Sequence, residues 1–188
     1  MSETTEQDHA PDPVTEQALA VIEEAVPGAV VAKELGGQHP WIQVGAEHIP
    51  AVCRALLEHD STQMDCCHLI SGTDYPDDNE IEVLYHLCSY SVPAPEGYAK
   101  RADKNDPWVC IRARLPRDKP EVPTVMDLWT GADWHERETY DLVGIVFTGR
   151  ERLERILLPE DWPGHPLRRD WEFPAEYHGI PIIPPEGM

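Results

Sequence analysis

The clearest strand pattern in this 188-residue chain is the stretch Trp108-Val109-Cys110-Ile111-Arg112-Ala113-Arg114-Leu115. Apolar side chains occupy every second position from Val109 to Leu115, and Arg112 and Arg114 fall on the other face, because successive side chains of a strand point to opposite sides of a sheet. A strand with one apolar face is covered by protein on that side. We therefore expect helices to cover one face of a sheet, as in a two-layer α+β domain.

Four further strands are expected around this one. Residues 64–71 and 81–90 are separated by a segment rich in turn-forming residues, which predicts an antiparallel hairpin. Residues 29–35 and 41–44 are joined across a Gly-Gly pair, which indicates a second hairpin. The expected fold is therefore α+β, with a mostly antiparallel or mixed sheet packed against helices.

Helical spacing marks the segments between and after these strands. Asp12 and Pro13 supply a cap and a first-turn proline for a first helix, which ends before Pro27-Gly28. A second helix begins near Pro50 and buries apolar side chains three to four positions apart, namely Val52, Cys53, Leu56 and Leu57. Residues 124–129 and 133–142 are expected to form two short helices.

The chain divides into three parts by composition. Residues 1–12 are acidic and poor in aromatics, so a disordered tail is expected there. Residues 13–158 carry the periodic segments and form the α+β domain. Residues 159–188 are an extended arm, because prolines recur too often for regular structure; they stand at 159, 163, 166, 174, 181, 184 and 185. Such an arm cannot build its own core and must lie on its own domain or on a partner.

Charge excludes several classes of partner. Thirty-five acidic against fifteen basic residues give a formal net charge of -20, which repels nucleic acid and anionic membrane surfaces. No apolar run approaches the roughly 20 residues that cross a bilayer, and the acidic N-terminus does not resemble a signal peptide, so a cytoplasmic chain is expected.

The five cysteines form no CxxC pair, and they suit reduced thiols better than a disulfide framework. Cys66-Cys67-His68 suggests a metal site. On a strand, however, Cys67 points away from its two neighbours, and a structural zinc site needs four ligands at suitable spacing. Buried cysteines are the favoured interpretation, and neither a metal ion nor an iron-sulfur cluster is expected in this chain.

Charged and aromatic residues crowd into residues 134–145 and 155–170. Asp133 and Glu136 have the spacing of a helix cap with a carboxylate at the third helical position. Trp134, Arg137, Glu138 and Asp141 share one helical face. That face is either an intramolecular ion-pair network or a docking surface, and the mixture of aromatics with arginine favours docking. Paired carboxylates without a nucleophile or a phosphate loop argue against catalysis here, so no catalytic residue is assigned.

These two stretches closely resemble the C subunit of the respiratory NADH:quinone oxidoreductase, complex I. The resemblance rests on Glu136-Arg137-Glu138-Thr139-Tyr140-Asp141-Leu142-Val143-Gly144-Ile145, on Arg155-Ile156-Leu157-Leu158-Pro159-Glu160-Asp161-Trp162 and on Gly164-His165-Pro166-Leu167-Arg168-Arg169-Asp170. The charged linker 148–152 and the acidic N-terminal extension depart from the family pattern as we expect it.

The resemblance implies a non-redox structural subunit of the peripheral arm, on the cytoplasmic side of the membrane. FMN and Fe-S clusters would lie in partner subunits, the quinone-binding D subunit and the Fe-S subunits, and the assembly would pass electrons from NADH to quinone with coupled proton translocation. The signature segment, residues 132–145, and the start of the arm would form the subunit interface, comprising Trp134, Glu136, Arg137, Glu138, Tyr140, Asp141, Gly164, His165, Pro166, Leu167, Arg168, Arg169 and Asp170.

Two other functions stay open at this point. One is the equivalent subunit of a membrane-bound hydrogenase or a deazaflavin-linked dehydrogenase, which differs only in the electron donor. The other is a free-standing acidic binding or assembly protein that uses the same arginine-rich face.

Overall fold

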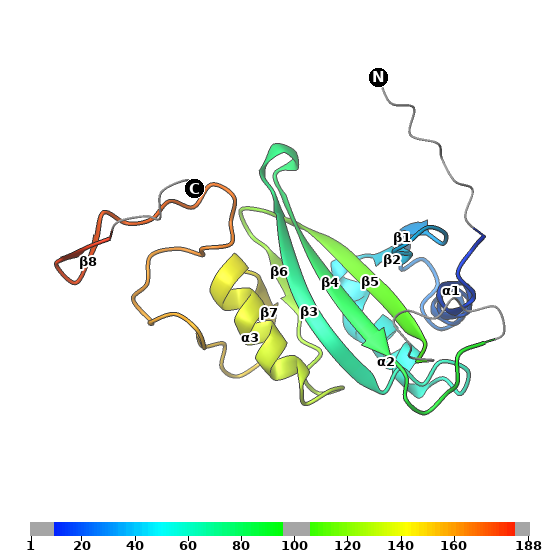
Figure 1. The fold of residues 1–188 in the computed structure, drawn as a ribbon. Helices are drawn as coiled ribbons and strands as arrows, with labels where there is room; N and C mark the ends of the chain where they lie inside the picture. The colour runs from blue at the N-terminus through cyan, green and yellow to red at the C-terminus, as the bar shows by residue number, and fades with distance from the viewer. Residues whose placement is uncertain (1–9, 96–105, 183–188) are drawn as a thin grey trace, which may run out of the picture.

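A computed structural model describes residues 10–95 and 106–182 of the chain. A five-stranded sheet packs against helices, and the last strands of the chain lie away from the sheet (Figure 1). The helices are α1 (Pro13–Ala25), η1 (Ala46–His48), α2 (Ile49–Glu58), η2 (Pro76–Asp78) and α3 (Ala132–Val143). The strands are β1 (Val30–Glu34), β2 (Trp41–Val44), β3 (Cys66–Tyr75), β4 (Glu80–Cys88), β5 (Trp108–Pro116), β6 (Glu121–Pro123), β7 (Val146–Thr148), β8 (Glu176–Tyr177) and β9 (Ile180–Pro181). The predicted α+β class is confirmed.

The main sheet has the strand order β1-β2-β5-β4-β3. β1 with β2 and β3 with β4 form the two predicted antiparallel hairpins, and β5 pairs antiparallel with β4. β2 pairs with β5 in parallel, with Ile42 opposite Ile111. The sheet is therefore mixed, and the N-terminal hairpin joins it through a pairing with a strand that is distant in sequence.

The apolar face of β5 is buried, as the alternation predicted. Its side chains at Val109, Ile111, Ala113 and Leu115 are each at most 2% exposed. α1 packs against β5 and α2, and α2 lies behind the sheet in Figure 1. Burial of this face against helices supplies the main core of the domain, because apolar burial is the dominant favourable term in folding.

The N-terminal boundary of the fold is set by Asp12. Its Oδ2 atom accepts hydrogen bonds from the backbone N and the Oγ1 of Thr15, at 2.8 and 2.7 Å, so it caps α1. Its own backbone N donates to the carbonyl of Leu35 at 2.6 Å. The predicted acidic tail, residues 1–12, thus ends in an ordered cap, while residues 1–9 lie outside the described ranges.

α3 packs directly on the edge strand β3, at a point where β3 has no side chain. A Cβ at Gly72 would lie 3.0 Å from Ile145 Cδ1 and 3.2 Å from the nearest methyl groups of Thr139 and Val143. The hydroxyl of Thr139 donates to the carbonyl of Ile70 at 3.1 Å. Glycine therefore allows the helix to approach the strand closely enough for a direct hydrogen bond.

The helix predicted over residues 124–129 is wrong. The structure has one turn there, in which Leu128 N and Trp129 N both donate to the carbonyl of Val125. The preceding residues form β6, which pairs in parallel with β7 beyond α3. A single turn shows the same apolar spacing as a short helix, and this similarity explains the error.

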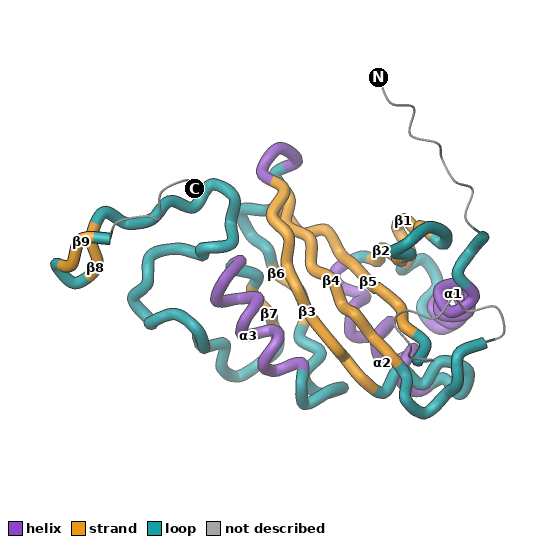
Figure 2. Tube along the Cα trace, in the orientation of Figure 1, coloured by secondary structure: helices purple, strands orange, loops and turns teal. Residues whose placement is uncertain are grey.

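The described part of the C-terminal segment is largely irregular. The tube view shows residues after β7 as loop, interrupted by the small antiparallel hairpin of β8 and β9 (Figure 2). Within the described ranges, none of the helices has the length and apolar character needed to span a bilayer.

Candidate docking surface

Glu136 lies inside the protein and ties α3 to the turn before it. It is 0% exposed, and its carboxylate accepts from Val125 N at 2.8 Å, Thr124 Oγ1 at 2.6 Å and Arg150 Nη1 at 2.9 Å. Burial raises the pKa of Glu136 above its ordinary value, and these hydrogen bonds and the Arg150 charge only partly oppose the rise. The predicted capping role of Asp133 and Glu136 is wrong, because the cap position is Gly131.

Arg150 is the counter-ion of this buried carboxylate. Its side chain is only 4% exposed, and its second Nη atom also contacts Asp133. A buried carboxylate without such a partner would be costly, since its desolvation is not repaid. The charged linker 148–152, which stood out from the family pattern, therefore supplies an internal ion pair.

Asp141 anchors the chain that returns across α3. It is 0% exposed, and its Oδ2 accepts from the backbone N of Ile156, Leu157 and Leu158 at 3.0, 2.8 and 3.0 Å. Its Oδ1 accepts from Arg155 Nη1 at 3.0 Å. Burial alone would raise the pKa of Asp141, but the three amides and Arg155 outweigh it and hold the pKa below its ordinary value.

The first part of the arm closes the C-terminal end of α3. Leu167 N and Arg168 Nε donate to the carbonyls of Leu142 and Val143, at 2.9 and 2.8 Å, and His165 Nδ1 lies 3.0 Å from the carbonyl of Asp141. These contacts satisfy carbonyls that a helix end leaves unpaired. Burial lowers the pKa of His165, and the nearby arginines add to the effect, so the ring is neutral at pH 7.

Gly144 permits this closure. It has φ +85°, and a Cβ there would lie 2.6 Å from His165 Cδ2 and 2.9 Å from Arg168 Nη2. No side chain fits the space that the arm occupies, and the left-handed backbone also favours glycine.

A second attachment holds the arm to the tip of the sheet. Asp74, which is 3% exposed on β3, accepts from Arg117 Nε at 2.7 Å and from Arg169 N at 2.9 Å. Arg117 Nη2 also donates to Asp170 at 2.5 Å. The Arg117 guanidinium and the Arg169 amide outweigh burial and hold the pKa of Asp74 below its ordinary value. The structure therefore packs most of residues 164–170 on their own domain, whereas docking of this segment on partners stays a prediction.

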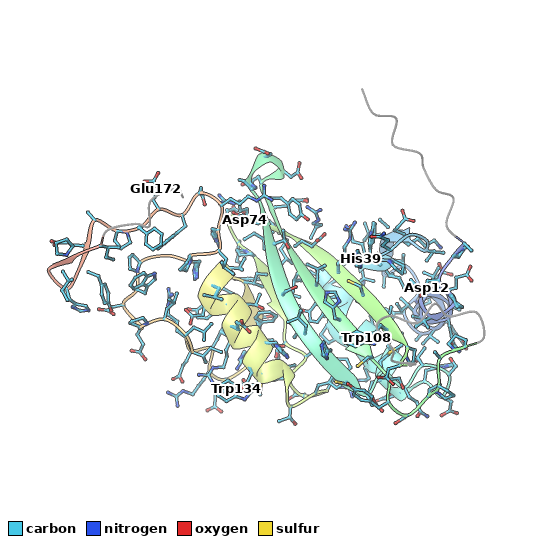
Figure 3. All side chains as sticks on the ribbon, viewed as in Figure 1. Asp12, His39, Asp74, Trp108, Trp134 and Glu172 are labelled. Atoms are coloured by element: carbon cyan, nitrogen blue, oxygen red, sulfur yellow. The ribbon has the colours of Figure 1, made fainter. Side chains whose placement is uncertain are left out.

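The exposed members of the predicted interface lie on the outer side of this scaffold. Trp134 is 62% exposed, and Arg137 lies over its ring at 5.3 Å. Figure 3 shows Trp134 at one end of α3, Asp74 by the hairpin tip and Glu172 on the arm. Glu138 and Leu142 line a shallow pocket of about 110 Å³ with Leu69 and Leu167. We call Leu69, Trp134, Glu138, Leu142 and Leu167 the α3–arm surface.

The arm holds a cluster of aromatic rings that come from both sides of Asp170 in the sequence. Trp162 stacks on Trp171 at 6.4 Å between centroids and contacts Tyr177 at 5.0 Å, and Phe173 meets Trp171 edge-on at 4.7 Å. Phe173 is 40% exposed. The arm therefore presents apolar surface of the kind that protein interfaces bury.

The predicted interface residues divide into two sets. The structure brings together Trp134, Glu138 and Leu167 near the surface, with Arg137 and Tyr140 half-buried. It buries Glu136 and Asp141. Among the remaining arm residues, His165 and Arg168 close the end of α3, and the carbonyl of Gly164 accepts from Arg155. Arg169 and Asp170 attach to the tip of the sheet, and Pro166 is half-buried between these contacts. The two buried carboxylates are therefore not part of the exposed surface; they fix the positions of the segments that they bind.

Sequence reasoning missed Arg150, Arg155 and the Asp74–Arg117 pair. Their partners lie 14, 14 and 43 residues away in sequence, beyond the reach of a helical or strand period. One feature of the sequence could have indicated these partners. α3 carries more acidic residues than the basic residues on the same helix can pair with, so arginines from other segments had to supply the remaining counter-ions.

Metal binding has no candidate cluster in the described ranges, where no three His, Cys, Asp or Glu side chains are grouped to hold an ion. His68 packs edge-on against Trp108 at 4.5 Å, and the five cysteines are reduced thiols.

Comparison with known proteins finds subunits of respiratory complexes. A family model described as the respiratory-chain NADH dehydrogenase, 30 Kd subunit, matches residues 42–177. The C subunit of the NADH-quinone oxidoreductase of Mycobacteroides abscessus is 33% identical over 178 residues, 92% of this chain and 71% of the relative. The protein of the same name from Roseiflexus castenholzii is 36% identical over 159 residues, 84% of each chain. A chain in the structure of a membrane-bound sulfane sulfur reductase, an archaeal respiratory membrane complex, aligns with TM-score 0.63 and 25% identity, covering 85% of this chain and 86% of that one.

Proposed function

The chain belongs to the family of the respiratory-chain NADH dehydrogenase 30 kDa subunit, and we propose that it is a non-redox structural subunit in the peripheral arm of an NADH:quinone oxidoreductase. FMN and the Fe-S clusters lie in partner subunits, and this chain keeps the quinone-binding D subunit and the Fe-S subunits in register. It associates with the cytoplasmic side of the membrane through the complex. The assembly passes electrons from NADH to quinone with coupled proton translocation.

The observation that carries the proposal is the location of exposed apolar side chains. Most of the large hydrophobic side chains exposed in the described ranges lie on α3 or on the chain that follows it, namely Trp134, Leu157, Leu167, Phe173 and Ile180. A chain with a formal net charge of -20 has little reason to expose several large apolar side chains along α3 and the following segment unless a partner buries them. The α3–arm surface, together with the exposed side chains of Leu157, Phe173 and Ile180 on the chain that follows α3, is therefore the proposed contact with partner subunits.

Internal ion pairs give this surface a fixed shape. Glu136, Asp141 and Asp74 each bind both a guanidinium and backbone amides of a distant segment. A surface that is ordered before binding loses less conformational entropy when it docks. Subunits that carry electron-transfer centres need such fixed spacing, which supports a positional role for the carboxylates.

Affinity purification from gently solubilised membranes tests the proposal. The tagged chain should recover iron-sulfur and quinone-binding subunits together with NADH:quinone activity. Trp134→Ala and Leu167→Ala should each reduce that recovery by about tenfold, as expected for interface anchors. Val31→Ala is the matched control, because Val31 is 65% exposed on β1, away from the surface, whereas Trp134 and Leu167 are 62% and 59% exposed.

Recovery that is unchanged in both surface variants would refute the proposed surface. The variants must also unfold at the same denaturant concentration as the parent chain, because the test concerns docking and not folding. Urea unfolding of the isolated chains provides that check.

A second candidate is the equivalent subunit of a related membrane complex with another electron donor. The likeness to a chain of the sulfane sulfur reductase complex favours keeping it, since that complex is not named for NADH. Co-purification of hydrogenase subunits or of a deazaflavin-linked dehydrogenase would support it. Recovery of the chain alone would instead support a free-standing acidic binding or assembly protein.

A further inference from the structure

Two cysteines lie directly opposite each other on neighbouring strands of the main sheet. Cys66 at the start of β3 is the direct antiparallel partner of Cys88 at the end of β4. Directly opposed residues of an antiparallel pair have Cα atoms about 4.5 to 5.5 Å apart, and a disulfide accommodates Cα separations of about 4.4 to 6.8 Å. The backbone therefore already has the spacing that a disulfide requires.

The two thiols are in contact in the reduced protein. The Cys88 thiol lies close enough to the side chains of Cys66 and Tyr90 for both to influence its pKa. Burial and the neighbouring Cys66 raise the pKa of Cys88 to about 12, so this thiol is protonated at neutral pH. Asp65, next to Cys66, accepts from Tyr90 N at 3.0 Å and fixes the chain just beyond Cys88. The start of β3 and the end of β4 are thus fixed side by side, which keeps the two sulfur atoms near each other.

Only one thiol of the pair is open to small reactants. Cys88 is 0% exposed, whereas Cys66 is half-buried and lines an open surface pocket of about 300 Å³ with Asp65, Leu128 and Gly131. Cys67 also borders this pocket but is only 7% exposed. A pocket of that size admits a molecule such as hydrogen peroxide. The accessible thiol and the enclosed one are arranged like an attacking and a resolving cysteine.

The other cysteines provide a contrast within the same chain. Cys53 and Cys67 lie in the core, where they are 0% and 7% exposed. Burial raises the pKa of Cys67 to about 12 and that of Cys53 still further. Cys110 faces His86, not a cysteine, across β4 and β5. Only Cys66 and Cys88 combine direct opposition with an accessible member.

We propose that Cys66 and Cys88 form a reversible cross-strand disulfide when the reduced chain meets hydrogen peroxide. The Cys66 sulfur attacks one peroxide oxygen, the O–O bond breaks, and a sulfenic acid and one water are formed. The Cys88 sulfur then attacks the sulfenic sulfur, loses its proton and releases a second water as the S–S bond forms. Two thiols lose two electrons and two protons, and one peroxide becomes two waters. Thiols such as glutathione reverse the step by exchange.

The bond would join the open ends of β3 and β4 beside the turn that leads into α3. Leu128 and Gly131 of that turn share the pocket with Cys66. Oxidation therefore changes the surface next to the first turn of α3. The proposal does not rest on the proposed function, because the disulfide forms or fails to form whichever complex the chain joins.

Mass spectrometry of the full chain tests this directly. The reduced protein is treated with hydrogen peroxide, remaining thiols are alkylated, and the protein is digested without reductant. We expect a cross-linked peptide joining Cys66 to Cys88, two hydrogens lighter than the sum of its parts and lost on treatment with glutathione. Cys66→Ser and Cys88→Ser should each abolish it, while Cys67→Ala and Cys110→Ala should retain it.

Two results would overturn the proposal. One is a cross-link that persists in Cys66→Ser, which would assign it to Cys67. The other is oxidation of Cys66 to sulfenic or sulfinic acid without any cross-link to Cys88. Intact-mass measurement of the peroxide-treated, unmutated chain identifies the second outcome without any variant, because a disulfide loses two hydrogens whereas a sulfenic or sulfinic acid gains oxygen. The first outcome is identified by comparing Cys66→Ser with Cys67→Ala.

Discussion

The sheet core and the α3–arm region are held together by different kinds of contact. In the core, β4 and β5 bury alternate apolar side chains such as Leu87 and Ile111, both 0% exposed. In the α3–arm region the fully buried groups include carboxylates, Glu136 and Asp141, each matched by an arginine and by backbone amides. Apolar packing tolerates substitutions that keep volume, whereas a matched buried charge leaves an unpaired partner when either member is removed.

The largest single effect is expected in the core. Leu87→Ala should lower the free energy of unfolding by about 4 kcal/mol, because it removes a fully buried side chain and leaves a cavity between packed layers. Urea unfolding of the isolated chain measures this. Leu69→Ala, at a side chain 37% exposed, is the control and should cost less than about 1 kcal/mol. Equal losses in both variants would contradict a core centred on β4.

Asp141→Ala should cost roughly 3 kcal/mol, because three amides and Arg155 lose their acceptor. Asp141→Asn keeps one oxygen and should cost less. The folded-state pKa of Asp141 is depressed, so its stabilisation is present above its ordinary pKa of 3.8 and is lost as pH falls through the folded value. The difference between parent and Asp141→Asn should therefore shrink below about pH 4 in urea titrations. A constant difference would show that the carboxylate charge is not what matters.

Arg150→Ala should cost about 2 kcal/mol at pH 7, since it leaves Glu136 buried without a counter-ion. In the parent protein, ionisation of Glu136 lowers the free energy of unfolding, whereas ionisation of Asp141 raises it. Glu136 has a raised folded pKa, so its charge costs no stability below its ordinary value of 4.5 and costs more as pH rises toward the folded value. The deficit of the variant should thus shrink as pH is lowered from 7 to 4.5. Restoration by the double variant Arg150→Ala with Glu136→Gln would strengthen this assignment, and a pH-independent deficit would refute it.

Gly144→Ala should cost about 1.5 kcal/mol and release the start of the arm, because the new Cβ displaces His165 and Arg168. Hydrogen exchange at the amides of Leu167 and Arg168 should accelerate while the amides of β4 and β5 stay protected. Gly149→Ala is a matched control, with φ +86° but its nearest contact at 3.7 Å. If both variants release the arm equally, backbone strain and not the clash is responsible.

The smallest stability effect is expected at Arg137. It is half-buried, lies 5.3 Å from the Trp134 ring and donates to the Glu154 carbonyl at 3.2 Å, so Arg137→Ala should change the free energy of unfolding by less than about 0.5 kcal/mol. Recovery of partner subunits should fall more clearly than stability. Proportional loss of both would favour the intramolecular network over docking.

The parts of the fold that have a local period were predictable. The alternation in β5 identified its buried face, and the turn chemistry between β3 and β4 identified their hairpin. The parallel pairs β2–β5 and β6–β7 were not predicted, because register between distant segments depends on the assembled core. For the same reason Glu136 and Asp141 resembled exposed members of a charged helix, while Arg150 and Arg155, which allow their burial, lie outside any helical neighbourhood.

The parallel pairing of Ile42 with Ile111 has a consequence for the order of folding. β3, β4 and β5 are neighbours in the sheet and can pair with one another before the N-terminal hairpin joins. That hairpin pairs with β5, so it can join the sheet only after β5 has formed. Contacts between distant segments require a larger loop to close, and this slows their formation. During synthesis the N-terminal hairpin emerges first but waits for its partner strand, so pulse-labelled hydrogen exchange should protect β4 before β2. The oldest part of the nascent chain is then the last to join the sheet.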